Sequence, residues 1–452
     1  MLAVHDVSEP ATATPPRVRL RGDLIGAGIA AALVLAAFVV PRIASEQWRS
    51  KLYAGAAPIF GVFLRHVGWG TIPAIVLATL VVLQGPTLAR RLSWRPLLAA
   101  SWGGALAWAF ALAMIDGWRR GFTDRLTDSN EYLHEVGGVT DIGAMLRGFA
   151  DRILDFEPDS WTTHVSGHPP GALLFFVLLD RAGLGGGAWA GTACLLIGTS
   201  AVVAVAVALR ALGAEDRARA ALPFLTLAPA AIWIAVSADA MFAGVTAWAV
   251  ALLALATKPA ATRLVAVAAG VLFGIGLYLS YGLVLMALPA VAVLLAGRTA
   301  RPLLPALAGA LAVVAAFTLS GFWWLDGYHL VVQRYYQGIA SERTYAYWWW
   351  ANLAATVCVV GLATAAALPR ALAPRVLHAL DPTALLVAAA LCAILAADLS
   401  GLSKAETERI WLPFDMWLLA ATAFLPRSSA RGWLAVQGIG TLVLAHSILT
   451  NW

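Results

Sequence analysis

The stretch Thr162–Phe176, TTHVSGHPPGALLFF, decides how the chain is expected to fold. His164 and His168 precede a Pro-Pro-Gly step, and an apolar run over 169–182 begins there. That run has roughly 14 residues, whereas a helix needs about 20 to cross the hydrocarbon core of a bilayer. Consecutive prolines favour a helix start at this point. The stretch therefore predicts a short helix that lies at a membrane surface and does not cross it.

The composition is typical of a polytopic membrane protein. Of 452 residues, 61% are hydrophobic and only 12% are charged, and the mean hydropathy is +0.78. The three cysteines all lie in apolar runs, which indicates neither a disulfide framework nor a metal motif. The net charge of +6 comes largely from arginines in short loops, so it indicates membrane topology and not nucleic-acid binding.

Apolar runs outside the opening stretch predict the membrane spans. They cover 24–41, 71–87, 97–115, 188–209, 220–236, 240–257, 263–279, 282–297, 303–324, 348–368, 384–399, 410–425 and 432–449. The basic loops between them place the spans relative to the cytoplasm. These loops contain Arg17, Arg19, Arg21, Arg90, Arg91, Arg95, Arg210, Arg217, Arg219, Lys258, Arg263, Arg298, Arg301, Arg370, Arg375, Arg427 and Arg431. All of them face the cytoplasm only if 169–182 does not cross the membrane.

The predicted fold is an all-α polytopic membrane protein with about 13 transmembrane helices and a cytoplasmic N-terminus. The tail 1–23 precedes two additional spans in 24–96. A membrane module follows over 97–325, and 326–452 holds the C-terminal helices. The loops 42–70, 116–187, 325–347 and 400–409 then lie on the external face. Loop 116–187 is strongly acidic, with ten of the chain's 25 acidic residues between Asp116 and His168.

Two candidate groups lie in loop 116–187. In TDSNEYLHEV (127–136), a helix would place Asp128, Glu131 and Tyr132 on one face, where a carboxylate at the membrane surface suits a general base. Alternatively, Asp128 is only a helix N-cap. His164 and His168 have the i, i+4 spacing of metal ligands, or they belong to a polar loop that caps the next helix.

Two further candidate groups lie near predicted external span ends. Asp239, in SADAMFAG, is an ionisable residue at a costly depth, which indicates either function or a helix cap. In SKAETERIWLPF (403–414), Lys404 and Arg409 are external cations suited to a lipid phosphate, and Arg343 is another. The alternative is a solvated loop in which Arg409 pairs with Glu406 or Glu408.

Taken in order, these motifs resemble those of C-type membrane glycosyltransferases, in the branch with protein O-mannosyltransferases and lipid A aminoarabinose transferases. The ordered set is Asp128-Ser-Asn-Glu131-Tyr132, then HPPG from His168, then Pro229 followed by Asp239, then ERIWLP from Glu408. It spans roughly 97–425. The chain departs from the family pattern where HPPG replaces HPPL, where the acidic pair is not adjacent, and where two spans precede the module.

The resemblance implies transfer of a sugar from a polyprenyl-phosphate donor to a glycan, lipid or protein acceptor, with inversion, at the external face of the plasma membrane. It implies Asp128 as general base with Glu131 beside it, and Arg409, Lys404 and Arg343 as donor-phosphate ligands. Tyr132, His164, His168, Asp239 and Glu408 would bind the acceptor or orient the site. The resemblance leaves two alternatives, a site without a metal and a site with a divalent metal ion bound by Asp128, Asp239 and His168. The sugar, mannose, arabinose or another, is not determined.

Two other functions remain possible on the sequence. A transporter or flippase for an envelope precursor would show internal repeats and charges at mid-membrane, and neither is evident. A lipid-linked glycan polymerase or ligase shares the many spans and large external loops. A membrane scaffold would have no reason to group Asp128, His168, Asp239 and Arg409. The enzyme hypothesis predicts that these four residues line one externally open cavity, and finding them on separate surfaces would overturn it.

Overall fold

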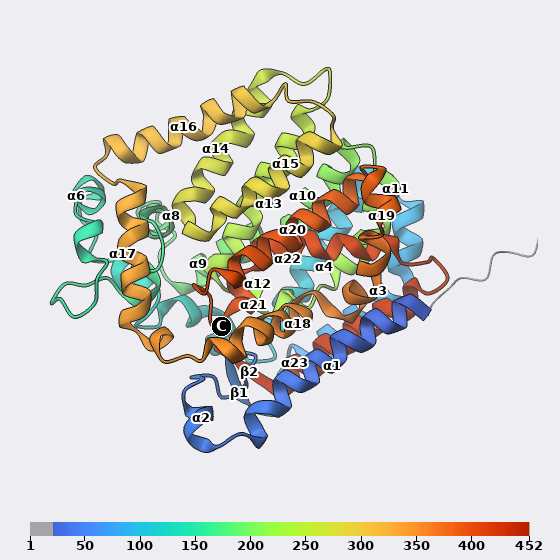
Figure 1. Cartoon of the computed structure of the whole chain (residues 1–452), viewed down its shortest axis with the longest axis horizontal. Helices are drawn as coiled ribbons and strands as arrows, with labels where there is room; N and C mark the ends of the chain where they lie inside the picture. Colours follow the sequence, from blue (N-terminus) through green and yellow to red (C-terminus); the bar gives the residue numbers. More distant parts are fainter. Residues whose placement is uncertain (1–20, 452) are drawn as a thin grey trace, which may run out of the picture.

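The computed structural model describes residues 21–451, so the predicted tail 1–23 lies outside the described residues apart from its last residues. The described chain is mostly helical (Figure 1). Seven of its helices are long and apolar enough to cross a membrane: α1 (Arg21–Ile43), α3 (Thr71–Arg91), α4 (Trp94–Ala113), the continuous pair α9 (Gly187–Thr199) and α10 (Ala201–Ala211), α13 (Ala238–Ala256), α18 (Tyr345–Ala371) and α20 (Pro382–Leu399). The pair α16 (Leu303–Leu319) and α17 (Trp324–Gln337) makes an eighth if it counts as one span, although it is bent by 74°.

The remaining apolar runs form helices that are shorter, broken or less apolar than these. They are α11 (Glu215–Thr226), α12 (Ala231–Ile234), α14 (Arg263–Leu279), η4 (Tyr281–Met286), α15 (Ala287–Ala296), α22 (Leu412–Leu418), η6 (Leu419–Phe424) and α23 (Ala430–Ser447). Three expectations are corrected here. The run 220–236 is not one helix, because Pro229 falls between α11 and α12 and has no N–H to continue the ladder. The run 410–425 is divided into α22 and η6, and 325–347 is largely helix α17 and not a loop.

Short elements fill the connecting segments. They are α2 (Glu46–Ser50), η1 (Arg119–Thr123), η2 (Arg125–Thr127), α5 (Leu133–Val136), α6 (Ile142–Arg147), η3 (Ala150–Arg152), α7 (Thr163–Ser166), α8 (Pro170–Arg181), η5 (Ile339–Ser341), α19 (Pro374–His378) and α21 (Thr407–Ile410). Helix α8 is the predicted short helix, with Pro169 as its N-cap. A Cβ on Gly171 would lie 2.5 Å from the carbonyl oxygen of Tyr278, so glycine is needed at this position.

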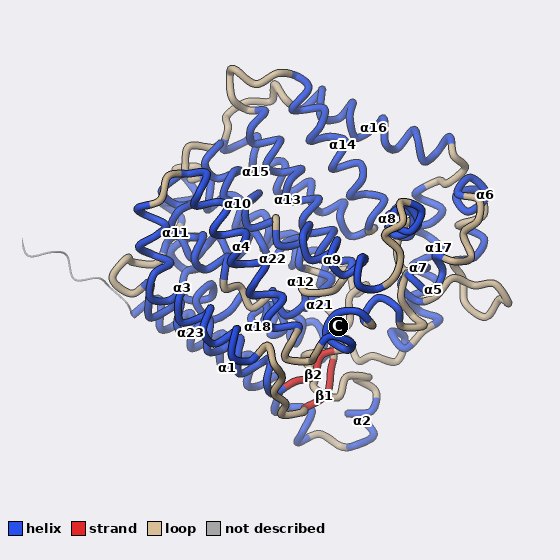
Figure 2. Tube along the Cα trace, turned by 180° about the vertical axis from the view of Figure 1, so that it is seen from behind, coloured by secondary structure: helices blue, strands red, loops and turns tan. Residues whose placement is uncertain are grey.

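The all-helical prediction is wrong in one place. Strand β1 (Gly61–Phe63) pairs antiparallel with β2 (Ile448–Thr450), so that Gly61 lies opposite Thr450. Figure 2 shows these strands beside the C-terminus. The last predicted span, 432–449, accordingly stops being helical at Ser447. The small sheet joins the end of the chain to segment 42–70.

The long helices pack through small residues. Helix α1 lies along α18, and α14 lies along α16 (Figure 1). A Cβ on Gly270 would lie 1.8 Å from the carbonyl oxygen of Ala306, and one on Gly244 would lie 2.1 Å from that of Ile197. Backbones this close are typical of helix packing in lipid, where small residues form the contacts.

The connecting segments contact one another in two groups. In the first, Arg219 donates to the carbonyl oxygens of Ala89 and Leu92, both at 2.9 Å, and Arg370 pairs with Asp23. In the second, residues of 42–70, 325–347 and 400–409 bond to one another, as described below. Arg125 also donates to the carbonyl oxygen of Thr450 at 2.9 Å, which connects loop 116–187 to the C-terminal strand. The first group contains predicted cytoplasmic loops, and the second contains predicted external loops.

Candidate functional site

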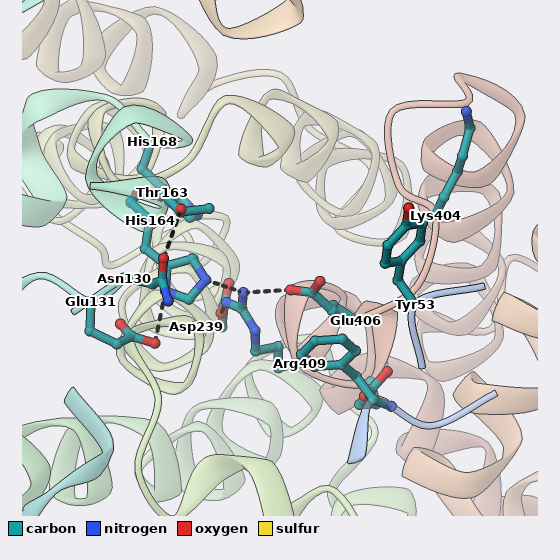
Figure 3. A network of polar contacts seen from close by, with 12 residues as sticks. Tyr53, Asn130, Glu131, Thr163, His164, His168, Asp239, Lys404, Glu406 and Arg409 are labelled. Atoms are coloured by element: carbon teal, nitrogen blue, oxygen red, sulfur yellow. Dashed lines mark hydrogen bonds and ion pairs between the residues drawn. The ribbon is translucent and has the colours of Figure 1, made fainter. Parts of the chain in front are cut away.

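Arg409, on α21, is the centre of a buried polar cluster (Figure 3). Its Nη1 lies 2.5 Å from Oδ2 of Asp239, in the first turn of α13. Its Nη2 lies 3.1 Å from Oε2 of Glu406 and 3.0 Å from Nε2 of His164. Burial alone would lower the pKa of Arg409, but the nearby carboxylates, chiefly Asp239 and Glu406, raise it above its ordinary value. The guanidinium therefore stays charged although only 6% of its side chain is exposed.

His164 connects Arg409 to Glu131. An arginine can only donate, so Nε2 of His164 accepts the bond from Arg409 and its Nδ1 carries the proton. That Nδ1 lies 2.8 Å from Oε1 of Glu131. The imidazole therefore lies between a buried carboxylate and a buried guanidinium.

His168 and Tyr132 form the next layer beside His164. Nδ1 of His168 lies 2.7 Å from the carbonyl oxygen of His164 and 2.8 Å from the Tyr132 hydroxyl oxygen. Because a carbonyl only accepts, this Nδ1 carries a proton. Burial lowers the pKa of His168, which favours the neutral ring and leaves Nε2 as an acceptor. Burial also raises the pKa of Tyr132, with further contributions from Asp239 and Glu131.

Glu406 joins Arg409 to a second buried arginine. Its Oε1 lies 3.2 Å from Nη1 of Arg343, which also donates to the carbonyl oxygen of Lys404 at 2.7 Å. Burial alone would raise the pKa of Glu406, but Arg409 and Arg343 lower it below its ordinary value. Nη2 of Arg343 lies 3.4 Å from the carbonyl oxygen of Tyr53, so segment 42–70 reaches the same cluster.

The backbone that carries Glu406 is strained. Ala405 has φ 70° and Glu406 has φ 62°, both in the left-handed region that non-glycine residues rarely adopt. Asn352, fully buried on α18, holds the preceding residues by donating to the carbonyl oxygen of Ser403 at 2.7 Å and to Asp398 at 2.8 Å. Non-glycine residues keep a left-handed backbone conformation only where surrounding contacts enforce it, and such residues are frequent at functional sites.

Lys404 and Glu408 are buried on either side of Glu406. Nζ of Lys404 donates to the carbonyl oxygen of Ala340 at 2.9 Å. Oε1 of Glu408 accepts from the backbone N–H of Phe60 at 2.8 Å, and the side chain has no exposed surface. Burial raises the pKa of Glu408 to about 7, so this carboxyl group is partly protonated at neutral pH.

Asp128 lies next to the cluster and not inside it. Its side chain is exposed, and its Oδ1 accepts from the backbone N–H and the side-chain amide of Asn130, at 3.0 and 3.1 Å. Asn130 in turn accepts from the backbone N–H of His164 at 3.0 Å and from the Thr163 hydroxyl at 3.1 Å. Asp128 is thus a solvent-accessible carboxylate on a turn that is fastened to the buried histidine.

The sequence also allowed purely structural roles for these residues, as helix caps or as a solvated ion pair, and the structure contradicts the two helix-cap roles. Ser237, and not Asp239, caps α13, because its hydroxyl accepts from the N–H of Ala240. Asp128 is no helix N-cap either, since α5 begins at Leu133. The Glu406–Arg409 pair of the loop hypothesis is present, but Arg409 is buried and not solvated.

Among residues 21–451 the candidates do not form a metal site, and they do not line the cavity beside α8. Within residues 21–451, no group of three or more His, Cys, Asp and Glu side chains is arranged to hold a metal ion. Asp239, one of the three proposed ligands, is instead paired with Arg409. A cavity of about 420 Å³ lies beside α8, lined by residues that include Thr127, His134, Phe176 and Asp180. None of Asp128, His168, Asp239 and Arg409 lines it.

Sequence reasoning missed two residues that organise the site. Glu406 was seen only as a possible partner in a solvated loop, although it bridges both arginines. Asn352 lies within a predicted span, and an amide among aromatic and small residues was the one signal that pointed to it. Both roles depend on contacts between segments that are distant in the sequence.

No family model, curated protein or solved structure matches the chain. The family resemblance therefore rests on the ordered motifs of the sequence. What the chain does has to be inferred from the chemistry of the cluster.

Proposed function

We propose that this protein is an integral-membrane glycosyltransferase that moves a sugar from a polyprenyl-phosphate donor to a glycan, lipid or protein acceptor at the external face of the plasma membrane. Asp128, His168, Asp239 and Arg409 do not line the cavity beside α8, so the proposal rests on another observation, the contact among the four loops. The four loops predicted to be external, 42–70, 116–187, 325–347 and 400–409, meet in one buried cluster around Arg409 and Arg343. A scaffold has no need for a dense charged cluster of this kind, because buried ion pairs contribute little net stability.

The proposed topology has 13 spans, with the N-terminus in the cytoplasm and the C-terminus outside. An odd number of crossings requires the two ends of the chain to lie on opposite faces. In support, Asp23 near the start of α1 pairs with Arg370 of a basic loop, whereas β2 at the end of the chain pairs with β1 of segment 42–70. The short helix α8 would rest at the outer interface.

The reaction would be a direct displacement. The acceptor hydroxyl oxygen attacks the anomeric carbon of the donor sugar while the bond from that carbon to the phosphate oxygen breaks. Prenyl phosphate leaves with the electron pair, and a carboxylate accepts the hydroxyl proton. Asp128 suits this role because it is exposed and its position is fixed by Asn130. Attack opposite the leaving group inverts the configuration at the anomeric carbon.

The buried residues would position the donor phosphate. Developing charge on the leaving phosphate is stabilised by fixed cations, for which Arg409, Arg343 and Lys404 are the candidates. Glu131 would act through His164, by keeping the imidazole oriented toward Arg409. Asp239 would hold the guanidinium of Arg409 from its inner side.

The other candidates would shape the acceptor side. The acceptor nitrogen of His168 suits a hydroxyl group of a sugar, and Tyr132 fixes the orientation of that ring. Glu408 would anchor the strained segment to segment 42–70 through its bond from Phe60.

An assay in detergent tests the proposal against transport. Purified protein is incubated with polyprenyl-phosphate mannose or arabinose and a panel of glycan, lipid and peptide acceptors, and free prenyl phosphate is quantified. The proposal expects release that depends on an acceptor. A transporter or flippase leaves the donor intact, because detergent provides no second compartment. A polymerase or ligase would act only on donors that carry preassembled glycans, and that result would replace the proposed function.

A further inference from the structure

Glu406 holds a position that a phosphate group would also fit. One of its carboxylate oxygens faces Arg343 and the other faces Arg409, at 3.2 and 3.1 Å. Two guanidinium groups that share one oxyanion form the kind of arrangement by which arginines bind phosphate. We propose that Glu406 is an internal stand-in for the phosphate of the prenyl-linked substrate, and that this phosphate, as the donor's diester or as the released prenyl phosphate monoester, binds between Arg343 and Arg409 by displacing it. This inference rests on the proposed function, because it concerns the same phosphate site.

Burial orders the cluster from outside to inside. The side chains of Arg343 and Arg409 are 4% and 6% exposed, and that of Asp239 is 3% exposed, whereas that of Glu406 is 18% exposed. Glu406 is therefore the outermost of these charged groups. An anion that approaches from the solvent side reaches Glu406 before it reaches either arginine.

The charges of the cluster favour a phosphate that replaces Glu406 over a phosphate that binds beside it. Asp239 and Glu406 already pair with the two guanidinium groups, and Glu131 adds a third carboxylate behind His164. A phosphate that entered beside Glu406 would place further negative charge in a weakly screened interior, where like charges repel strongly. If Glu406 leaves as the phosphate arrives, each arginine keeps an anionic partner. Asp239 can stay in place, since it contacts Arg409 through the other terminal nitrogen, Nη1.

The backbone supplies a reason for Glu406 to leave. Ala405 and Glu406 both hold left-handed conformations, which are unfavourable in a residue with a Cβ. The two ion pairs with Glu406 offset that cost in the absence of ligand. Once a phosphate occupies the arginines, segment 400–406 can relax, and the bound donor thereby opens the site around itself.

Affinity measurements on the full chain in lipid nanodiscs test the proposal. The probes are geranylgeranyl phosphate, a short prenyl phosphate monoester, and inorganic phosphate, which separates binding of the headgroup from binding of the chain. Glu406→Gln keeps the volume of the side chain and removes its charge, so it is expected to bind both probes about tenfold more tightly. Glu157→Gln is the matched control, because Glu157 is an exposed glutamate of loop 116–187 and is expected to bind like wild type.

Hydrogen exchange on the wild-type protein gives a second measurement that does not depend on a variant. Saturating geranylgeranyl phosphate is expected to increase amide exchange in 400–406 while the start of α13 stays protected. The proposal is overturned if Glu406→Gln binds the probes no more tightly than wild type, if neither protein binds either probe, or if exchange in 400–406 does not rise.

The outcomes separate this inference from the proposed function. Tighter phosphate binding by Glu406→Gln without any sugar transfer by the wild type would support the displacement of Glu406 by phosphate and reject the glycosyltransferase function. Sugar transfer by the wild type with unchanged phosphate affinity in Glu406→Gln would support the glycosyltransferase function and reject the displacement of Glu406 by phosphate.

Discussion

Replacing Arg409 by glutamine is expected to be among the most destabilising single changes in the described chain. The substitution removes the guanidinium group that Asp239, Glu406 and His164 all contact, and only Glu406 keeps a second arginine, Arg343. Breaking a buried ion pair by removing one partner costs about 3–5 kcal/mol. Arg409 serves two carboxylates at once and only 6% of its side chain is exposed, so we expect a loss near the upper end of that range. Domains are typically stable by about 5–15 kcal/mol, so the loss is a large part of the total.

Unfolding in mixed micelles with increasing SDS, followed by tryptophan fluorescence, measures this loss at pH 7. The deficit should shrink as the pH falls toward 5, because the stranded carboxylates can then take up protons and lose their charge. Arg119→Gln is the matched control. Arg119 pairs with Asp124 at 3.1 Å, but 84% and 45% of the two side chains are exposed, so the cost should stay below about 1 kcal/mol. Equal stabilities of Arg409→Gln and Arg119→Gln would refute the buried cluster.

Three further changes test its surroundings. The folded-state pKa of Glu408 is raised to about 7 from an ordinary value of 4.5, so its contribution to stability is complete below pH 4.5 and is lost as the pH rises through 7. Unfolding at several pH values should show wild type losing about 3 kcal/mol over that interval relative to Glu408→Gln, and parallel curves would contradict this. Asn352→Ala should cost about 2–3 kcal/mol and speed amide exchange in 400–406, because Asn352 holds Ser403; unchanged exchange would count against that support. Tyr132→Phe should cost about 1 kcal/mol through the lost contact with His168, and a cost above 3 kcal/mol would show another role.

The helices were largely predictable because their signal is local. The run 263–279 coincides with α14, and the two prolines of HPPG predicted the start of α8. Strand β1 was not predictable in this way, since its partner β2 lies at the other end of the sequence and three-residue strands leave no periodic pattern. Helix α17 was missed because tyrosines and polar residues interrupt its apolar side, which reads as a loop in a chain this hydrophobic.

The sequence predicted which residues belong to the site better than it predicted how they contact one another. His164, Asp239 and Arg409 were chosen because ionisable residues are costly beside lipid, and the structure brings them into direct contact. Glu406 was passed over because a glutamate three residues before an arginine is usually an ordinary surface pair. Its bridging role depends on Arg343 and on a left-handed backbone, and neither is visible in local sequence. For the same reason, the sequence could not show that Asp128 lies outside the buried cluster.

The most direct test is the rate at which purified protein releases prenyl phosphate from its donor when Asp128 is replaced by asparagine. The hydrogen bonds of the exposed Asp128 side chain within residues 21–451 are with Asn130, so the variant should fold and bind donor like wild type. Loss of the base should slow release by about 10²–10⁴-fold. Asp151→Asn, which changes another exposed carboxylate of loop 116–187, should release prenyl phosphate at the wild-type rate. Undiminished release by Asp128→Asn would contradict the assigned base, and no release by the wild type from any donor would contradict the glycosyltransferase itself.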